Sequence, residues 1–375
     1  MNPSIPGSVS EMLQELIRIP SVNPDGSPDA GPITGEKRCA EQVAAWLSEM
    51  GAAVVFEEVL PDRPNVLGRF PGPSGRPRIA LAPHLDTVGV DHMTIDPFGG
   101  EIRNGRIFGR GASDTKGTMA AMLWALHGMG PDRLAELNTE VTFVGLMGEE
   151  TNQPGSRDFA KKHEGAFDFA LIGEPTELDI VYVHKGCAWV ELETRGRAAH
   201  GSMPERGENA ILKMSRFFEE TLPVMTEDLR KYSDPVLGGS TVNLGICQGG
   251  SRANIVPDRC VATLDFRTTP ALAERGLKAF LSDYLTEEHS YRLLHECLPL
   301  SNDPENPYIK KLESLGSRLT GAPWFCDAAM LAARGIPAVA LGPGSIRQAH
   351  TNDEYLEVEA LEKGAERYRA FLEAC

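Results

Sequence analysis

The sequence lacks the features of a membrane or exported protein. No apolar run approaches the roughly 18 residues that a membrane-spanning helix needs. The opening residues, MNPSIPGSVSEMLQELIRIPSV, have no basic region, apolar core or cleavage site of a secretory leader. We therefore expect no membrane partner and a cytoplasmic location.

Paired cysteines and basic stretches are also missing. The seven cysteines are scattered without paired spacing, which does not suggest a disulfide framework or a cysteine-rich zinc cluster, so we expect reduced thiols. The formal net charge is −16, and there is no stripe of Lys and Arg. Because phosphate binding needs a basic surface, the sequence argues against a nucleic-acid partner.

Short apolar runs and helical patterns alternate along much of the chain. With 375 residues, 41% of them hydrophobic, the chain is long enough for one large or two medium domains. Four apolar runs end abruptly in polar loops and predict buried parallel strands: 78–86, 140–150, 168–176 and 336–344. Helical patterns occur at about 35–50, 115–129, 154–163 and 357–373. This order predicts an α/β fold with a doubly wound, mostly parallel sheet.

The pattern changes near residue 185. From there, alternating strand-like segments and two helical segments predict an inserted α+β domain over residues 185–298. The apolar strand and helix pattern resumes after Pro299 to Pro307. We expect one domain built from residues 1–184 and 299–375, and a second one inserted into it.

Histidine and acidic residues follow the predicted strands of the first domain. Ligands bind at the carboxyl ends of strands in open α/β sheets, and those ends carry His84 and Asp86, Glu149 and Glu150, Glu174, and His350. Each has an ordinary explanation when taken alone, such as a solvated strand end or a turn, and Asp114 could simply cap a helix. Together they would crowd negative charge into one crevice, which is unfavourable without cations.

The types of these residues favour a catalytic metal site. Two imidazoles and three carboxylates suit zinc, cobalt or manganese, and the lack of cysteine argues against a purely structural zinc site. Asp86 lies two residues after His84 on the same strand face, where it can accept the second imidazole N–H. Neighbouring residues at a strand end point to opposite sides, so one of Glu149 and Glu150 can bind metal while the other serves as general base.

The same residues lie within longer motifs that follow one another along the chain. They are HLDTV (84–88), DPFGGEIRNGRIFGRGASDTKG (96–117), the glutamate pair, GEPT (173–176), GRAAHGSMPERGENAI (196–211), GG…ANIVPD (249–258), DFR (265–267) and AHTNDE (349–354). From PSVNP at 20–24 to AHTNDEY at 349–355, the sequence resembles the co-catalytic metallohydrolases that include acetylornithine deacetylase, succinyl-diaminopimelate desuccinylase, aminoacylase and glutamate carboxypeptidase.

The resemblance implies a role for each residue of the first domain. It implies two divalent ions bridged by Asp114, with His84 and Glu174 completing one site and Glu150 and His350 the other. Glu149 resembles the general acid/base of the family, and Asp86 resembles the residue that orients His84. Zinc is the expected metal, with cobalt or manganese as alternatives.

The resemblance also assigns the inserted domain as a lid that mediates dimerisation. His200 resembles the lid histidine that polarises the scissile carbonyl and, in dimeric members, reaches the partner subunit's active site; a solvated turn histidine is the alternative. Asn254 and Arg267 resemble substrate-binding residues, although Arg267 could instead pair with Asp265. The 342–344 loop, with Gly344, resembles backbone that lines the pocket.

The expected function is therefore a metal-dependent amidohydrolase. We expect it to remove an acetyl- or succinyl-type group from a small N-acyl amino acid, by means of a metal-bridging water that Glu149 activates, and to form a homodimer through the lid. A carboxypeptidase or dipeptidase is the first alternative. A non-catalytic relative that binds metabolites is disfavoured because every ligand position is present. Two segments, TNQPGSRDF (151–159) and WFCDAAML (324–331), depart from the family pattern and leave the substrate open.

Overall fold

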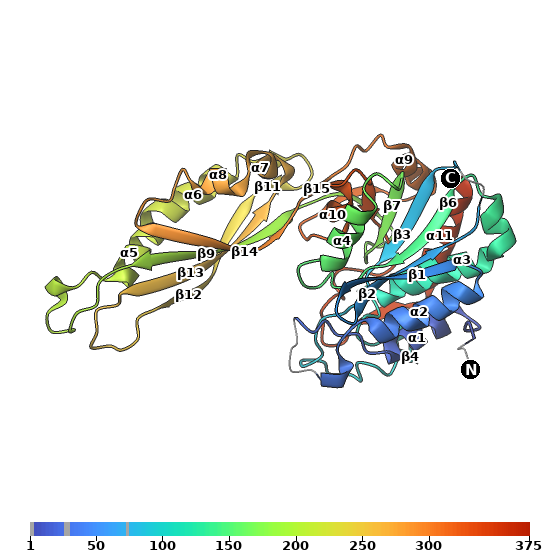
Figure 1. Ribbon diagram of the computed structural model, residues 1–375, viewed down its shortest axis with the longest axis horizontal. Coiled ribbons are helices and arrows are strands. Elements are labelled where there is room, and N and C mark those ends of the chain that lie inside the picture. The colour runs from blue at the N-terminus through green and yellow to red at the C-terminus, as the bar shows by residue number, and fades with distance from the viewer. Residues whose placement is uncertain (1–3, 26–30, 73–74) are drawn as a thin grey trace. The chain divides into compact units, whose positions relative to one another are not determined.

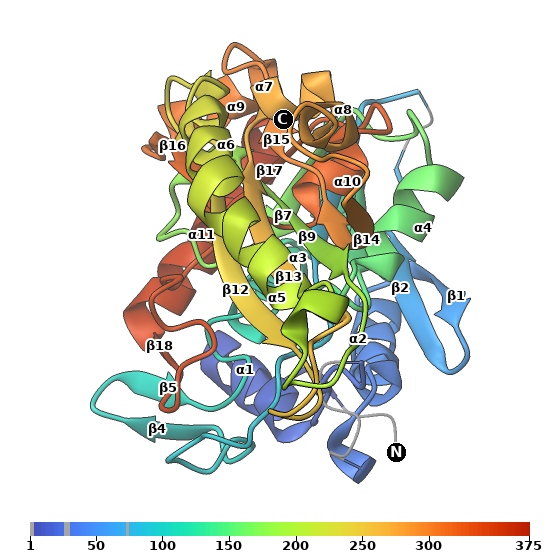
Figure 2. The ribbon, with the colours of Figure 1, turned by 90° about the vertical axis from the view of Figure 1, so that its left-hand side faces the viewer.

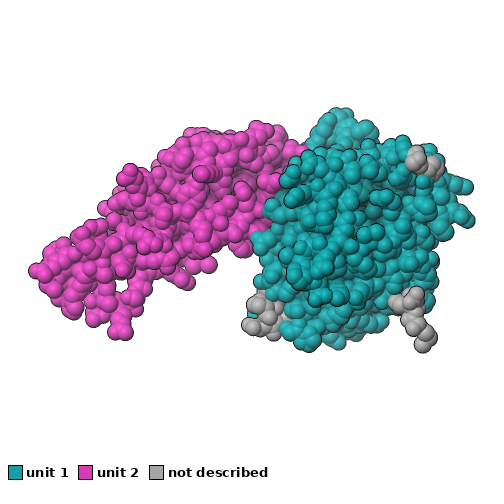
Figure 3. Space-filling view, viewed as in Figure 1, with its two compact units in different colours: residues 1–182, 302–320, 326–375 teal, residues 183–301, 321–325 magenta. Residues whose placement is uncertain are grey.

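The computed structural model describes residues 4–25, 31–72 and 75–375 of the chain. The chain forms two compact units (Figure 3). Unit 1 comprises Met1–Tyr182, Asn302–Thr320 and Cys326–Cys375, and unit 2 comprises Val183–Ser301 and Gly321–Phe325. The roles of catalytic domain and lid, and the boundaries expected for them, stay predictions.

Unit 1 is built around the larger sheet (Figure 1). The order of its strands is β1 (Ala53–Leu60), β2 (Arg63–Arg69), β6 (Glu140–Gly145), β3 (Arg78–Pro83), β7 (Phe169–Gly173), β17 (Ala338–Ala340) and β8 (Ile180–His184). The boundary between the units crosses β8 and its neighbour β16 (Leu319–Ala322), and β15 (Leu300–Ser301) belongs to unit 2. The central strands β6, β3, β7 and β17 are parallel. They are the four strands that the apolar runs predict.

Helices cover both faces of this sheet. They are α1 (Val9–Arg18), α2 (Lys37–Glu49), α3 (Lys116–Glu136), α4 (Pro154–Lys162), α9 (Pro307–Ser314), α10 (Ala328–Ala332) and α11 (Val358–Ala374). Strand β2 contacts a helix on each face of the sheet. Its Gly68 lies against Leu47 of α2, while its Asn65 donates to the carbonyl of Gly155 in α4. Since 65 and 68 differ by an odd number, they point to opposite faces.

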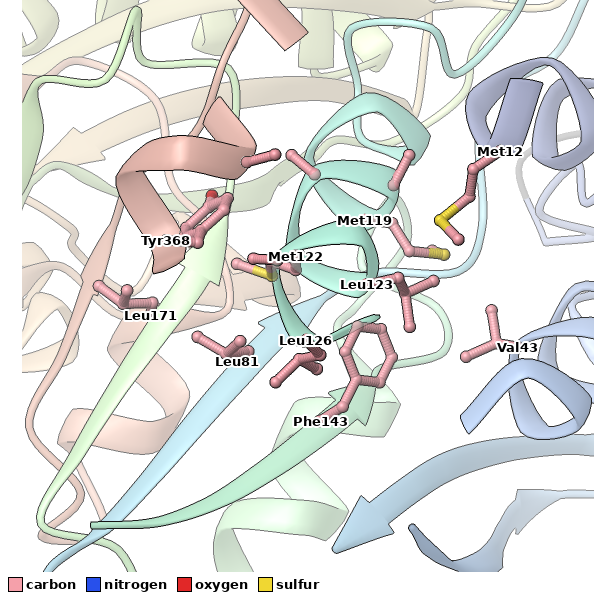
Figure 4. Close-up of a cluster of buried hydrophobic side chains, with 14 of the residues drawn as sticks. Met12, Val43, Leu81, Met119, Met122, Leu123, Leu126, Phe143, Leu171 and Tyr368 are labelled. Atoms are coloured by element: carbon pink, nitrogen blue, oxygen red, sulfur yellow. The ribbon is translucent and has the colours of Figure 1, made fainter. Parts of the chain in front are cut away.

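Helix α3 forms the centre of the core in unit 1. Its first half is rich in Ala, Met and Leu, which are good helix formers, and almost every side chain there is buried. Figure 4 shows the packing of α3 between the central strands and helices α1, α2 and α11, with Met119, Met122, Leu123 and Leu126 near Leu81, Phe143, Leu171, Tyr368, Met12 and Val43. The helix is interrupted at Gly130, where φ is 70°. Pro131 follows, and a residue before proline avoids the helical region.

Unit 2 is an antiparallel sheet with helices on one face (Figures 1 and 2). The strand order is β12 (Thr241–Gly249), β13 (Arg259–Thr268), β9 (Gly186–Arg195) and β14 (His289–Cys297). Alternate residues of β9, such as Ala188, Val190 and Leu192, pack against a cluster from α5 (Ala210–Arg216), α6 (Leu222–Leu229), α7 (Pro270–Arg275) and α8 (Leu277–Leu281). A large, mostly parallel sheet with a separate antiparallel sheet confirms the expected fold class.

Smaller elements complete the chain. A three-stranded sheet joins β18 (Tyr355–Glu357), β5 (Arg106–Phe108) and β4 (Glu101–Arg103), and a two-stranded one joins β10 (Ser233–Asp234) and β11 (Gly238–Gly239). There are also short helices at Gly31–Ile33 and Pro204–Arg206 and a π-helical turn at Phe217–Thr221. Within the described ranges, no helix combines the length and the apolar character needed to cross a membrane.

Lys116 is a buried cation that joins two helices of unit 1. Its side chain is at the start of α3, and the residue is only 1% exposed. Its Nζ donates to the carbonyls of Leu16 (3.0 Å) and Ile19 (2.6 Å) at the end of α1. The Leu16 carbonyl also accepts the N–H of Ile19 (3.2 Å), so Lys116 gives it a second donor. Lys116 also donates to the Ile19 carbonyl just past the end of the helix, where carbonyls have no partner within the helix. Burial lowers the pKa of this amine.

We expect Lys116→Met to lower the free energy of unfolding by roughly 1–3 kcal/mol, because the carbonyls of Leu16 and Ile19 lose the hydrogen bonds that Lys116 donates. Urea unfolding followed by circular dichroism measures this change. The control is Lys363→Met, which removes an exposed lysine paired with Glu359 and should leave the transition unchanged. Equal stability of the Lys116 variant and the wild type would contradict the capping role.

Candidate metal centre

Four of the predicted ligands converge at the carboxyl edge of the central strands. His84 follows β3, Glu150 lies in the turn after β6, and one ligand atom from each of His84, Asp114 and Glu150 lies within 4.8 Å of the other two. His84 Nε2 is 3.0 Å from Asp114 Oδ1. His350 Nε2 is 3.3 Å from Asp114 Oδ2 and 3.1 Å from Glu150 Oε2. Asp114 therefore presents one carboxylate oxygen to each histidine.

Glu174 follows β7 at the same edge of the sheet and is 4% exposed. Its Oε1, like Oε1 of Glu150, is a buried oxygen with no hydrogen-bond partner in the described part of the chain. Buried polar atoms normally have partners, and a carboxylate oxygen without one is costly. Burial raises the pKa of Glu174 well above its ordinary value, and the charge of Asp114 raises it further.

The histidines and carboxylates of the cluster shift one another strongly. Hydrogen bonds to Asp114 and Glu150 raise the pKa of His350 to about 10. Burial lowers the pKa of His84, but its hydrogen bonds to Asp114 and Asp86 outweigh burial and raise this pKa well above the usual value. Burial would raise the pKa of Asp114, but the two histidines hold it below its ordinary range.

This donor set fits divalent cations. Imidazole nitrogens and carboxylate oxygens are the ligands of catalytic zinc, cobalt and manganese sites. A bound cation would replace the protons that compensate the negative charge of the carboxylates in this cluster. It would also provide a partner for the unpaired oxygens of Glu150 and Glu174.

Glu149 adds a buried carboxylate beside the cluster. The residue is 8% exposed. Burial raises the pKa of Glu149 well above its ordinary value, and the charge of Glu174 raises it further. A carboxyl group with a raised pKa is suited to accept a proton and later release it, which is the behaviour of a general acid/base.

Asp86 makes more contacts than the single one expected from the sequence. His84 Nδ1 is 3.0 Å from the backbone oxygen of Asp86 and 3.5 Å from its carboxylate. The Asp86 carboxylate also accepts Nδ2 of Asn23 (2.8 Å) and the backbone N–H groups of Glu149 (3.0 Å) and Glu150 (3.1 Å). Asp86 thus holds the glutamate turn as well as lying against His84.

The 342–344 loop packs against residues of the cluster. At Gly344, φ is 88°, and a Cβ there would lie 2.7 Å from Oγ of Ser113, next to Asp114. A Cβ at Gly342 would lie 2.7 Å from the backbone oxygen of Glu174. Glycine is therefore required at both positions. Gly344 also lines a cavity of about 500 Å³ with Glu177, Arg347 and others, but none of the five ligand candidates lines it.

The candidate residues of the inserted domain lie in unit 2. His200 is exposed, and its Nδ1 is 2.7 Å from Oγ of Ser202. The N–H of Gly201 donates to the carbonyl of Asn254 (2.8 Å), so the His200 and Asn254 segments are adjacent. Arg267 pairs with Asp265 at 3.1 Å, which is the structural alternative that the sequence left open.

Three residues of unit 1 that the sequence did not single out belong to the surroundings of the site. Asn23 binds Asp86. Glu354 accepts the backbone N–H of Asp114 (2.9 Å). Asp327 is 1% exposed and accepts Oγ of Ser156 (2.5 Å), and its burial raises its pKa to about 6. Asn23 and Glu354 lie in motifs that carry the family resemblance, whereas Asp327 lies in one of the segments that depart from it.

A family model described as peptidase family M20/M25/M40 matches residues 80–374. The chain belongs to this family. The resemblance stated from the sequence is confirmed, and this member of the M20/M25/M40 family is a metallohydrolase that acts as a deacylase or a peptidase.

Relatives with similar sequences span nearly the whole chain. Acetylornithine deacetylase from Edwardsiella ictaluri is 32% identical over 96% of this chain and 95% of its own length. Acetylornithine deacetylase from Proteus mirabilis is 29% identical over the same shares.

Solved structures with similar folds cover nearly the whole chain. An M20 metallo-carboxypeptidase from Sulfolobus solfataricus has a TM-score of 0.76 at 21% identity and covers 98% of this chain and 99% of its own. A tripeptidase from Staphylococcus aureus has a TM-score of 0.77 at 20% identity, covering 97% of both chains.

We expect metal binding by this M20 chain to release protons and to strengthen as pH rises. The pKa of His350 is about 10, so His350 holds a proton at neutral pH that must leave before its nitrogen can bind a metal. Raising the pH makes this loss less costly, and the apparent affinity for zinc should therefore increase from about pH 6 to pH 8. Calorimetric titration of the metal-free protein in buffers of different ionisation enthalpy measures both quantities.

The matched controls are His350→Ala and His127→Ala. His127 lies within α3 and is not part of the cluster. His350→Ala should lower both the affinity and the number of protons released, whereas His127→Ala should change neither. An affinity that does not depend on pH, or identical behaviour of the two variants, would contradict the assignment of His350 as a ligand.

Proposed function

We propose that this protein is a two-metal amidohydrolase that removes an acetyl- or succinyl-type group from a small N-acyl amino acid. The observation that supports it most is Asp114, whose two carboxylate oxygens face His84 and His350 respectively. That arrangement suits a carboxylate shared between two ions. The full-length similarity to acetylornithine deacetylases favours an acylated amino acid as the substrate.

The proposed metal ligands all belong to unit 1. Asp114 would be shared, with His84 and Glu174 on one ion and Glu150 and His350 on the other. We propose zinc as the bound metal, and cobalt or manganese would suit the same ligand atoms. When bound, such a pair supplies Lewis-acid polarisation of the amide carbonyl and lowers the pKa of water.

Glu149 is the proposed general base and acid. Its carboxylate would take a proton from the attacking water and then donate it to the nitrogen of the leaving amine. Two features support this role: burial beside Glu174 raises the pKa of Glu149, and its backbone N–H is fixed by Asp86. The backbone N–H groups of Glu149 and Glu150 both donate to the Asp86 carboxylate, which keeps the two residues in a fixed relation to each other.

Residues of unit 2 are proposed to bind the substrate. His200 would donate a hydrogen bond to the scissile carbonyl, a contact that is typically worth about 2.7–4 kcal/mol in the barrier. Asn254 and Arg267 would bind the substrate's polar groups. The guanidinium of Arg267 suits a substrate carboxylate, because it can donate two parallel hydrogen bonds. It would bind this carboxylate while it also pairs with Asp265. Gly344 would contribute backbone to the pocket.

A peptidase is the second candidate. The solved structures with similar folds include a metallo-carboxypeptidase of the M20 family and a tripeptidase. Both reactions break a linear amide bond, and the same metal ligands and base serve either of them.

A substrate panel tests the proposal. Protein reconstituted with zinc or cobalt is given N-acetylornithine, N-acetyl and N-succinyl derivatives of other amino acids, and dipeptides. We expect kcat/KM for an N-acyl amino acid to exceed that for every dipeptide by about tenfold or more. Glu149→Ala is the control, and its turnover should fall by roughly 10²–10⁴ with metal content unchanged. Dipeptides as the best substrates would favour the peptidase, and turnover by Glu149→Ala at the wild-type rate would remove the role of Glu149.

We also propose a homodimer formed through unit 2. Strand β12 is the edge of its sheet, and apolar side chains along it are exposed, with Leu244 at 36% and Ile246 at 55%. An edge strand presents unpaired backbone groups that can pair with a second copy. Such a dimer would allow His200 of one protomer to act in the active site of its partner.

Mixing two inactive variants tests whether His200 acts across the dimer. Glu149→Ala and His200→Ala homodimers should each be nearly inactive. After subunit exchange at equal concentrations, about half of the dimers contain one subunit of each variant. If His200 acts across the dimer, one of the two sites in each mixed C2 dimer has both residues intact. About a quarter of wild-type activity should then return. If activity does not return although native mass spectrometry shows mixed dimers, His200 acts within its own subunit. Fully active His200→Ala homodimers would instead remove the proposed role of His200.

A further inference from the structure

Glu354 has a buried carboxylate whose two oxygens are both fully engaged. The residue is 0% exposed and lies four positions after His350, directly before β18. Its Oε1 accepts the backbone N–H groups of Ser113 (2.8 Å) and Asp114 (2.9 Å). Its Oε2 accepts the backbone N–H of Gly111 (3.0 Å) and Nη1 of Arg110 (2.7 Å). Four donors from the loop before α3 therefore converge on one side chain.

The contacts fix the loop that carries Asp114. Backbone N–H groups that point to a common centre form a concave site for an anion, and the Glu354 carboxylate occupies that position for the 111–114 loop. Buried N–H groups without a partner are costly, so the loop keeps this conformation only while the carboxylate is present. At Gly111, φ is 85°, and a Cβ there would meet Thr87 and Lys116 at 3.0 Å, so the neighbouring backbone is closely packed as well.

Glu354 also belongs to the segment that carries His350. Its backbone carbonyl accepts the N–H of Gly109 (3.0 Å), and the next residue, Tyr355, pairs with Phe108 of β5. The segments before Asp114 and after His350 are therefore joined by backbone pairing and by the Glu354 side chain. At their ends, Asp114 Oδ2 and His350 Nε2 are 3.3 Å apart.

We propose that Glu354 is a positioning residue that sets the placement of Asp114 relative to His350 and thereby the geometry of the metal ligands. This role rests on the proposed two-metal function. It differs from that of a ligand, because the donors around Glu354 already occupy both of its oxygens.

The chemistry of the contacts distinguishes glutamate from glutamine at this position. A carboxylate accepts at both oxygens, and here each oxygen has two donors. An amide has only one oxygen, so in either orientation its NH₂ would face the N–H groups of Ser113 and Asp114 or those of Gly111 and Arg110. Glutamine has nearly the same size as glutamate, and Glu354→Gln therefore tests hydrogen bonding without opening a cavity.

The experiment measures metal binding in the absence of substrate. The metal-free wild type, Glu354→Gln and Glu354→Asp are titrated with cobalt, and the visible absorption of the bound ion is recorded at a temperature where circular dichroism shows each variant to be folded. We expect Glu354→Gln to bind cobalt about 10–100-fold more weakly, as losses of ligand-orienting groups do, and to show a changed spectrum. Glu354→Asp retains both acceptor oxygens on a shorter side chain, so its affinity should lie between those of the other two.

The control for lost stability is Leu312→Ala. Leu312 lies in α9, is buried in the core and is not part of the metal-ligand cluster. This variant should therefore melt at a lower temperature but keep the cobalt affinity and spectrum of the wild type. If Glu354→Gln fails to fold, Glu354→Asp carries the test. Wild-type affinity and spectrum in the folded Glu354 variants would overturn the positioning role and leave the proposed function intact. A wild type that binds no cobalt would instead overturn the proposed function, and the positioning role with it.

Discussion

Several carboxylates share a small buried volume at the carboxyl edge of the central strands, and this crowding constrains every element around it. The fold compensates the charges in different ways. The carboxylates of Asp86 and Glu354 accept backbone N–H groups, so both hold loops in place. Asp114 lies between two histidines, while Glu150 and Glu174 each keep a buried oxygen without a partner in the described chain. The pattern of partners thus separates carboxylates that support the site from those that can bind a cation.

The sequence predicts the part of this arrangement that follows from strand direction. Because β3, β6 and β7 are parallel, the residues that follow them lie at one edge of the sheet. The ends of apolar runs were therefore enough to bring together His84, Glu149 and Glu174. His350 was expected with them from the loop after the 336–344 run. Asp114 lies in a loop whose course no periodicity predicts, and its role as the shared ligand came from the family resemblance.

Most of the supporting contacts could not be predicted from the sequence, since they join residues far apart in the chain. Glu354 and Asp114 are separated by 240 positions, and nothing in the spacing of either motif indicates which backbone groups the carboxylate accepts. The Asp86 contact with His84 was predicted from strand geometry, but its bonds to the turn at Glu149 depend on the loop conformation. In unit 2 Arg267 pairs with Asp265, the alternative that the sequence left open, and the strand period of two explains this pairing because it places both residues on the same face.

The two segments that depart from the family pattern form one structural feature of unit 1. Gln153 and Ser156 lie in the first, Asp327 lies in the second, and both side chains donate to Oδ1 of Asp327. The charge of Asp327 also raises the pKa of Glu149, after the larger effects of burial and of Glu174. Only the loss of both Gln153 and Ser156 would remove both of these donors from the buried carboxylate of Asp327, so its burial depends on the first segment as a whole. The two segments thus meet through Asp327 and form part of the surroundings of the proposed base.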